Sequence, residues 1–200
     1  MGGKSSGWLS DCSLMVDEFK YIDAKTRVGL VADADRLRHF RRYRDDCTSL
    51  NIENFLEIAS EIYPPSLTLT QENDQPNRAS VLDMVAEIQD GRVTTKVYCK
   101  TDDFPFNVIS FPFLESNIDS KMCYRVFYGQ VVRYQRLSSF KVDFEERVGI
   151  LAGILTARGY HENFLRRQFC RAVDKYTTEF QKWALPLDLA NWFYQIVRSR

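Results

Sequence analysis

Two adjacent carboxylates, Asp45 and Asp46, lie between two short runs of strand-like residues. The first run covers residues 37–43 and the second residues 47–50, so the pattern predicts a hairpin with Arg44, Asp45 and Asp46 in its turn. Mg²⁺ prefers oxygen ligands and often binds through one or two carboxylates together with substrate phosphates. Two adjacent acids repel each other, and a bound cation removes that repulsion. The pair therefore predicts a metal site at a hairpin tip, although an ordinary polar turn explains the same residues.

The composition is that of a soluble globular protein with room for one domain or two small ones. Of the 200 residues, 44% are hydrophobic and 27% are charged. No apolar run approaches the ~20 residues that span a bilayer, and the N-terminus lacks the apolar segment of a signal peptide. Five scattered cysteines indicate reduced thiols rather than a disulfide framework or a zinc site. These features predict an intracellular protein, cytoplasmic or nuclear, that does not bind membranes.

The basic residues are clustered although the net charge of the chain is zero. One cluster lies within residues 36–44 and the other within residues 158–171, and for nucleic-acid binding the distribution of charge matters more than its sum. In the second cluster Arg166, Arg167 and Arg171 lie mostly off the apolar stripe of a predicted helix. These arginines are candidates for contacts with a nucleic-acid backbone. The alternative is a core helix with a solvated face.

The order of the predicted elements indicates an α+β fold. Helices and strands alternate in residues 1–100, and helices fill residues 120–200. An Asp-Gly pair at residues 90–91 between two strand-like runs is a strong hairpin signal, and Gly159 and Pro186 fit a helix end and a helix start. Further strands are predicted at residues 66–70, 80–88 and 92–99, and helices at residues 8–21, 53–62, 121–137, 141–158, 162–183 and 187–198.

The segment Tyr43-Arg44-Asp45-Asp46 resembles the Tyr-x-Asp-Asp box of reverse transcriptases, with a predicted strand on each side. Three other segments resemble this family in the same order. Residues 1–6 resemble the loop that opens a palm helix beside the incoming nucleotide, and residues 53–70 resemble the next palm segment. Residues 80–100 resemble the hairpin that grips the primer end, most of all its form in Penelope-like and related retroelements. The resemblance implies a partial polymerase palm at residues 1–100, a connecting loop at 101–119 and an all-α, thumb-like region at 120–200.

The resemblance also implies a role for each matched residue. Asp45 and Asp46 would bind Mg²⁺ or Mn²⁺ and be the catalytic residues of two-metal nucleotidyl transfer. The partners would be a primer–template of RNA or DNA and deoxynucleoside triphosphates. From the residues alone, the two N-terminal glycines also fit a flexible terminus, and Tyr98 also fits a core position. The residues that would contact the nucleotide or the primer are Gly2, Gly3, Tyr43, Val97 and Tyr98.

The sequence departs from the family in two respects. The proline before the nucleotide-side loop, the fingers and the palm strand with the other essential aspartate have no counterpart here, which predicts an N-terminally truncated chain that does not polymerise alone. Arg44 stands where the family usually has a smaller or apolar residue. The alternatives are a non-catalytic nucleic-acid-binding or interaction module on the same scaffold, and a fragment without a stable fold. The sequence makes no prediction of the oligomeric state.

Overall fold

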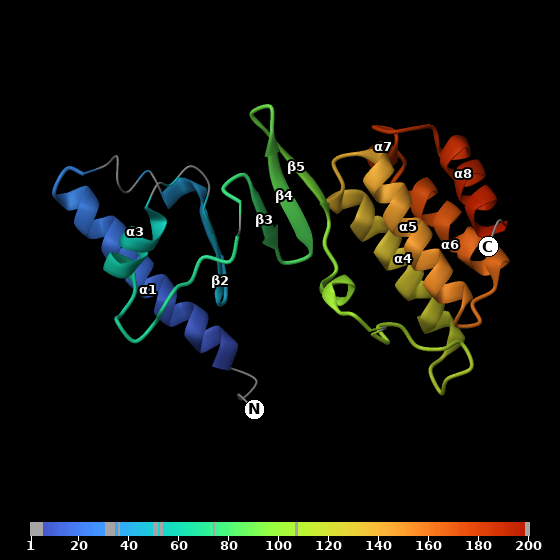
Figure 1. Ribbon diagram of the computed structural model, residues 1–200, viewed down its shortest axis with the longest axis horizontal. Helices are drawn as coiled ribbons and strands as arrows, with labels where there is room; N and C mark the ends of the chain where they lie inside the picture. Colours follow the sequence, from blue (N-terminus) through green and yellow to red (C-terminus); the bar gives the residue numbers. More distant parts are fainter. Residues whose placement is uncertain are drawn as a thin grey trace. The chain divides into compact units, whose positions relative to one another are not determined.

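The computed structural model describes residues 6–30, 35, 37–49, 52, 54–73, 75–106 and 108–198. Its backbone divides into two compact units, Met1–Glu72 and Asn73–Arg200, each with its own hydrophobic core. Both units contain helices and an antiparallel sheet, so the predicted α+β class is confirmed (Figure 1). No helix in the described part of the chain is long and apolar enough to cross a membrane.

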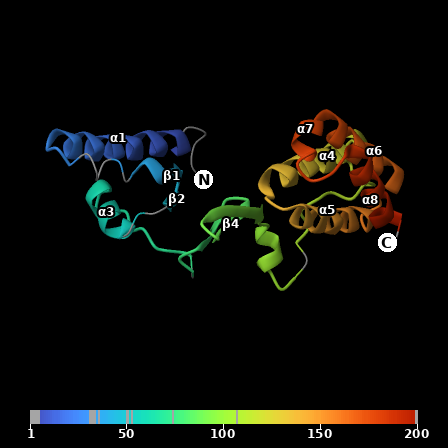
Figure 2. The ribbon, with the colours of Figure 1, turned by 90° about the horizontal axis from the view of Figure 1, so that it is seen from above.

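A long helix, a hairpin and a short helix make up the first unit. Helix α1 (Ser6–Arg27) continues beyond its predicted end at residue 21. The hairpin and the short helix lie on the same side of α1, with the hairpin beside its N-terminal half (Figure 2). These elements are the 3₁₀ helix η1 (Leu37–His39), strands β1 (Phe40–Tyr43) and β2 (Asp46–Ser49), and helix α3 (Phe55–Ile62).

The core of the first unit is small. Helix α3 is amphipathic, as its spacing predicts, and its buried residues pack with those of α1. Phe40 at the start of β1 stacks on Phe55 of α3, with ring centroids 5.2 Å apart. Because little apolar surface is buried, polar contacts have a larger part in holding the hairpin to α1. The buried members of this core are Tyr21, Leu37, Ala59, Ile62 and Tyr63.

A three-stranded antiparallel sheet opens the second unit, with strand order β3-β4-β5. The predicted turn at residues 90–91 is present, and both residues have positive φ, 50° and 72°, as a two-residue loop of type I′ requires. The prediction of one strand over residues 80–88 is wrong, because a second two-residue turn at Leu82 and Asp83 separates β3 from β4. The strands are β3 (Arg78–Val81), β4 (Met84–Gln89) and β5 (Arg92–Val97).

The helices of the second unit pack around an aromatic core (Figures 1 and 2). The rings of Phe169 and Phe193 are stacked 4.3 Å apart and join α6 to α8. The largest side chains that are fully buried in this core are Phe127, Phe144, Phe169, Phe180 and Phe193. The helices are α4 (Ser120–Leu137), α5 (Lys141–Thr156), α6 (Glu162–Lys175), α7 (Thr177–Phe180) and α8 (Pro186–Arg198).

The ends of two helices agree with the sequence-based predictions. Gly159 has a φ of 85° and closes α5. Its N–H donates to the Thr156 carbonyl and the Tyr160 N–H donates to the Leu155 carbonyl, which is the hydrogen-bond pattern of a Schellman motif. Pro186 is the first residue of α8, where its missing N–H costs no helical hydrogen bond.

Two further predictions of secondary structure are wrong. Residues 66–70 form no strand, although apolar and polar residues alternate there. No strand in the described part of the chain pairs with them, and of these residues Leu69 packs against the core. The helix predicted over residues 162–183 is interrupted at Tyr176, whose φ and ψ of −115° and 38° are not helical. The apolar periodicity continues across this break, so the pattern does not reveal it.

Polar contacts from Ser139 and Arg133 help to hold the sheet of the second unit to the helices. Ser139, in the turn between α4 and α5, donates its N–H to the Thr95 carbonyl at 2.8 Å, and its hydroxyl oxygen accepts from the Thr95 N–H at 2.8 Å. Arg133 of α4 forms an ion pair with Asp83 in the β3–β4 turn. The first contact also satisfies backbone groups on the outer edge of β5, which would otherwise be open to pairing.

Candidate functional site

The predicted hairpin of the acidic pair is present, but its first strand begins at Phe40 and not at residue 37, because residues 37–39 form the 3₁₀ helix η1. Tyr43 pairs with Asp46 across the two strands, so the turn consists of Arg44 and Asp45 alone. The prediction that Asp46 lies in the turn is therefore wrong, because this residue is the first of β2. Residues that face each other in an antiparallel ladder project from the same side of the sheet. Tyr43 and Asp46 consequently share one side of the hairpin, and Arg42 and Cys47 share the other.

The side that carries Tyr43 and Asp46 is open to solvent. Tyr43 is 57% exposed, and Arg44, Asp45 and Asp46 are exposed as well. Neither acid forms an ion pair within the part of the chain that the structure describes. The carboxylate oxygens at the tip are thus available as ligands for a hard cation, which could complete its coordination with water or phosphate oxygens.

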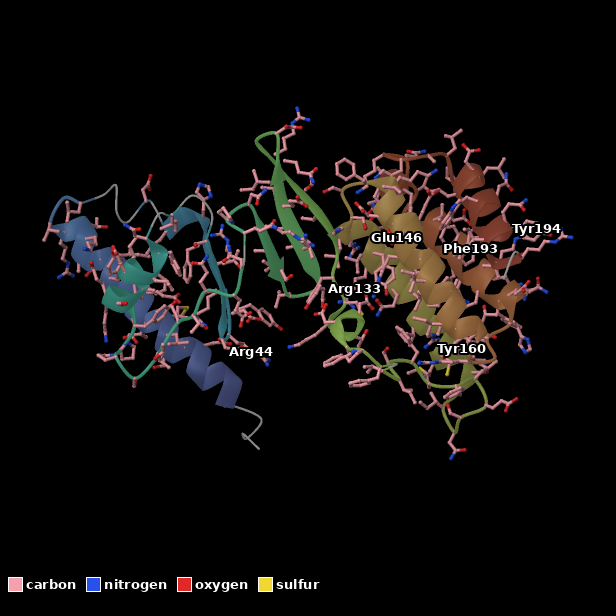
Figure 3. All side chains as sticks on the ribbon, in the orientation of Figure 1. Arg44, Arg133, Glu146, Tyr160, Phe193 and Tyr194 are labelled. Atoms are coloured by element: carbon pink, nitrogen blue, oxygen red, sulfur yellow. The ribbon has the colours of Figure 1, made fainter. Side chains whose placement is uncertain are left out.

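Arg44 has a backbone conformation that side chains of L-residues rarely adopt. Its φ is 56°, in the left-handed region. Its guanidinium lies over the Tyr43 ring at 5.8 Å from the centroid. Figure 3 labels Arg44 at the tip of the hairpin. Left-handed backbone costs a residue with a Cβ atom about 1–2 kcal/mol relative to the right-handed form. Strained residues of this kind persist where the surrounding structure holds them, and they are concentrated at functional sites.

Arg42 fastens the hairpin to α1 from the opposite side. Its side chain is only 10% exposed. The Nε atom donates to the Glu18 carboxylate at 2.6 Å, and Nη1 donates to the Asp11 carboxylate at 2.9 Å. The fork also reaches two main-chain carbonyls, that of Asp11 at 3.1 Å and that of Arg44 at 3.3 Å. One planar cation therefore links two turns of α1 to the turn that carries the acids.

The polar network continues from Glu18 to α3. The Tyr63 hydroxyl donates to the same Glu18 oxygen at 2.8 Å. Burial and this hydrogen bond to a carboxylate raise the pKa of Tyr63 above its usual range, so the phenol stays a donor. Burial opposes the charge of Arg42, but the hydrogen bonds and charge of Glu18 outweigh it and raise the arginine pKa. Burial also raises the pKa of the Cys47 thiol, which keeps it protonated and a poor metal ligand.

The predicted backbone-binding arginines line a shallow, open groove whose lining residues all belong to α6. Each guanidinium lies over an aromatic ring: Arg166 over Tyr194 at 4.4 Å, Arg167 over Phe164 at 5.5 Å, and Arg171 over Tyr128 at 5.7 Å. Figure 3 labels Tyr194 on α8. The rings limit the motion of the arginines without neutralising their charge. The other residues that line the groove are Asn163, Cys170, Asp174 and Lys175.

The remaining predicted residues fall in two places. Gly2 and Gly3 lie outside the described residues. Val97, the last residue of β5, is half-buried and packs against the core of the second unit. Tyr98, the next residue, is half-buried, and its hydroxyl donates to the Asp103 carboxylate. The structure therefore groups Tyr43 with Asp45 and Asp46 in the first unit, and Val97 with Tyr98 in the second.

The sequence-based reasoning missed Arg42, Glu18 and Asp11. A signal for them exists: Arg42 alternates with Tyr43 along β1, so one of the two must face inward. Asp11 and Glu18 are seven residues apart on α1, a spacing that places them on one face. In the described part of the chain, the hairpin tip included, no three His, Cys, Asp or Glu residues are grouped so that they could hold a metal ion.

Comparisons of the chain with protein-family models, with curated proteins and with solved structures found no match.

The strain at Arg44 generates a prediction for stability. Arg44→Gly is expected to raise the free energy of unfolding of the first unit by roughly 0.5–1 kcal/mol, because relief of the left-handed strain exceeds the entropy that glycine adds to the unfolded chain. Arg41→Gly, a change in the adjacent strand, is expected to lower it by about the same amount. Denaturant titration followed through amide signals of the first unit measures both. A loss of stability in Arg44→Gly would contradict the left-handed turn.

Proposed function

We propose that this chain is part of an RNA-directed DNA polymerase of retroelement origin, a reverse transcriptase. The observation that carries the proposal is the hairpin of residues 40–49, which presents Asp45 and Asp46 at an exposed tip behind an aromatic residue. In this proposal, residues 1–100 are the later part of the palm and residues 120–200 are the thumb, with residues 101–119 between them.

The two acids would hold Mg²⁺ or Mn²⁺. Their donors suit these ions, because both are exposed carboxylates and neither is neutralised by a basic side chain within the described residues. In nucleotidyl transfer such ions activate the primer hydroxyl and stabilise the leaving pyrophosphate. The role of this chain would be to hold the two carboxylates in place. Tyr43, on the same side of the hairpin as Asp46, would contact the primer end or the nucleotide.

The second unit would hold the nucleic acid. Val97 and Tyr98 follow the Asp-Gly hairpin at the point where the chain leaves β5, and we assign them to contacts with the primer. The sheet of the second unit is fastened to its helices through Ser139 and Arg133. A nucleic acid bound by the β4–β5 hairpin and by α6 would therefore contact one compact unit. The substrates would be a primer–template of RNA or DNA and deoxynucleoside triphosphates.

Helix α6 would bind the nucleic-acid backbone. Arg167, Arg171 and Lys175 follow one another at intervals of four residues, so they stand in a row with an axial spacing of about 6 Å. In the described part of the chain, no carboxylate forms an ion pair with Arg166, Arg167 or Arg171. A row of cations steadied by aromatic rings is suited to phosphates that repeat along a strand.

The α6 groove favours a second candidate, a nucleic-acid-binding module without catalysis. It requires the arginines of α6 and does not require Asp45 and Asp46. We expect the sequence, tested as it stands, not to extend a primer, because the family's other metal-binding aspartate has no counterpart in the matched segments. Binding of metal at the hairpin tip is therefore the measurement that separates the two candidates.

Mn²⁺ is expected to bind at the hairpin tip. In amide spectra of the full chain, low concentrations of Mn²⁺ should broaden the signals of Asp45 and Asp46, because both carboxylates can ligate it. Asp45→Asn combined with Asp46→Asn should abolish the effect without changing the shape of the side chains. Asp90, the acid in the turn of the other hairpin, is the internal control. Equal broadening at Asp90 and at the tip would show that Mn²⁺ is attracted non-specifically to exposed carboxylates, and it would contradict the metal site.

Binding of a primer–template duplex is expected to depend on salt through α6. Arg166→Ala combined with Arg167→Ala should weaken binding and reduce the slope of log K against log salt by about 0.7–0.9 for each lost phosphate contact. Lys121→Ala combined with Arg125→Ala removes the same charge from α4 and should leave the slope unchanged. Fluorescence anisotropy over a salt series measures this. Equal losses in the two double variants would show that only overall charge matters and would contradict the assignment of α6.

A further inference from the structure

We infer that Arg42 is the positioning residue of the acidic pair: its guanidinium holds the backbone of the turn and thereby fixes where Asp45 and Asp46 present their carboxylates. This inference rests on the proposed function and adds to that site a residue that touches neither metal nor substrate. The geometry that carries it is the contact between the fork of Arg42 and the Arg44 carbonyl, made while the same fork grips α1.

The Arg44 carbonyl is the part of the turn through which Arg42 can act. This oxygen belongs to the peptide unit that joins Arg44 to Asp45, and a peptide unit is planar. A hydrogen bond to the oxygen, 3.3 Å from Nη1, therefore restricts the orientation of the whole unit, including the Asp45 N–H. The left-handed φ of Arg44 lies immediately before this unit. Arg42 thus supports the strained residue at its carbonyl, where the chain enters the acids.

The other hydrogen bonds of the Arg42 guanidinium give this support a fixed base. Nε and Nη1 bind carboxylates of α1 that are seven residues apart, and Nη2 binds the Asp11 carbonyl. A helix is stiffer than a two-stranded hairpin, which is marginally stable by itself. One rigid, planar group, the Arg42 guanidinium, therefore fixes the position of the hairpin tip relative to α1. A lysine ammonium, which is a point charge on a flexible stem, cannot reach the same acceptors with a fixed geometry.

The charges of the network leave the acidic pair free to bind a cation. Glu18 and Asp11 supply two negative charges to the one positive charge of Arg42, so this cation is already neutralised from the side of α1. Its contact with the turn is to a main-chain oxygen and not to a carboxylate. Arg42 can consequently order the tip without acting as a counter-ion that competes for Asp45 and Asp46.

Arg42→Lys tests the inference, because it keeps the charge beside Glu18 and removes the fork. Phe40→Leu is the matched control: Phe40 lies two residues earlier on the same side of β1 and packs on Phe55, so its change loosens the hairpin without touching the turn. Three quantities are measured on the full chain: the amide chemical shifts of residues 44–46, the Kd for Mn²⁺ at Asp45 and Asp46, and the stability of the first unit.

Arg42→Lys is expected to shift the amide signals of the tip and to raise the Kd for Mn²⁺ about 10–100-fold, the usual effect of losing a residue that orients metal ligands. Phe40→Leu is expected to lower stability and leave that Kd unchanged. Asp11→Ala, at the exposed end of the network, should raise the Kd less, and it serves as the test variant if Arg42→Lys does not fold.

Three results would overturn the inference. Unchanged tip signals and an unchanged Kd in folded Arg42→Lys, or in Asp11→Ala where that variant is used, would make Arg42 a structural anchor only. If the Kd for Mn²⁺ rises as much in Phe40→Leu as in Arg42→Lys, Arg42 is likewise a structural anchor only. If the wild-type tip binds no Mn²⁺, the proposed metal site is contradicted, and the amide chemical shifts of residues 44–46 test the inference alone. Unchanged chemical shifts of these residues in Arg42→Lys overturn it. Changes in chemical shift that are confined to these residues support it.

Discussion

The first unit depends on one buried guanidinium. A two-stranded hairpin is barely stable without a surface to pack on, and the apolar core that α1 and α3 offer is small. Arg42 adds polar contacts to this small core by joining β1 to Glu18 and Asp11 of α1. Tyr63 donates a further hydrogen bond to Glu18. We expect this part-buried ion pair to favour one register of the hairpin, because a hairpin in another register would leave its charges without partners. The position of the acidic tip follows from this contact.

Successive side chains of β1 project from opposite sides of the hairpin, so the residues that anchor it and the residues of the candidate metal site lie on different sides. Phe40 and Arg42 share one side of β1, where Phe40 packs on α3 and Arg42 binds α1, whereas Tyr43 projects from the other side together with Asp46 of β2. A shift of register by one residue would exchange these roles and bury the acid in place of the arginine. The second unit shows a similar division: Phe169 of α6 and Phe193 of α8 lie in the core, while Arg166, Arg167 and Arg171 of α6 lie outside it, each against an aromatic ring. Both candidate sites are thus the outer sides of elements whose inner sides hold the fold.

Much of the local structure could be predicted from the sequence, because its causes are local. The turn at residues 90–91 needs positive φ at both positions, which Asp and Gly supply, and Gly159 closes α5 for a similar reason. The turn at Leu82 was missed because a leucine with a φ of 52° gives no such signal. Residues 66–70 alternate like a strand but have no strand to pair with among the described residues, and pairing depends on distant parts of the chain.

The contacts of Arg42 could not be predicted for a different reason. They join residues 24 and 31 positions apart in the chain, so no local pattern contains them. The acidic pair itself was found because its two members are neighbours. The identity of the chain as a polymerase palm and thumb, its metal and its nucleic acid remain proposals that the hairpin and the α6 groove support.

The most direct test of this account is a set of nuclear Overhauser contacts in the isotope-labelled full chain. The account predicts cross-strand contacts between Tyr43 and Asp46, and contacts from the Arg42 guanidinium protons to Glu18 of α1. Helical contacts through residues 40–49, or an Arg42 side chain that shows none to α1, would contradict it.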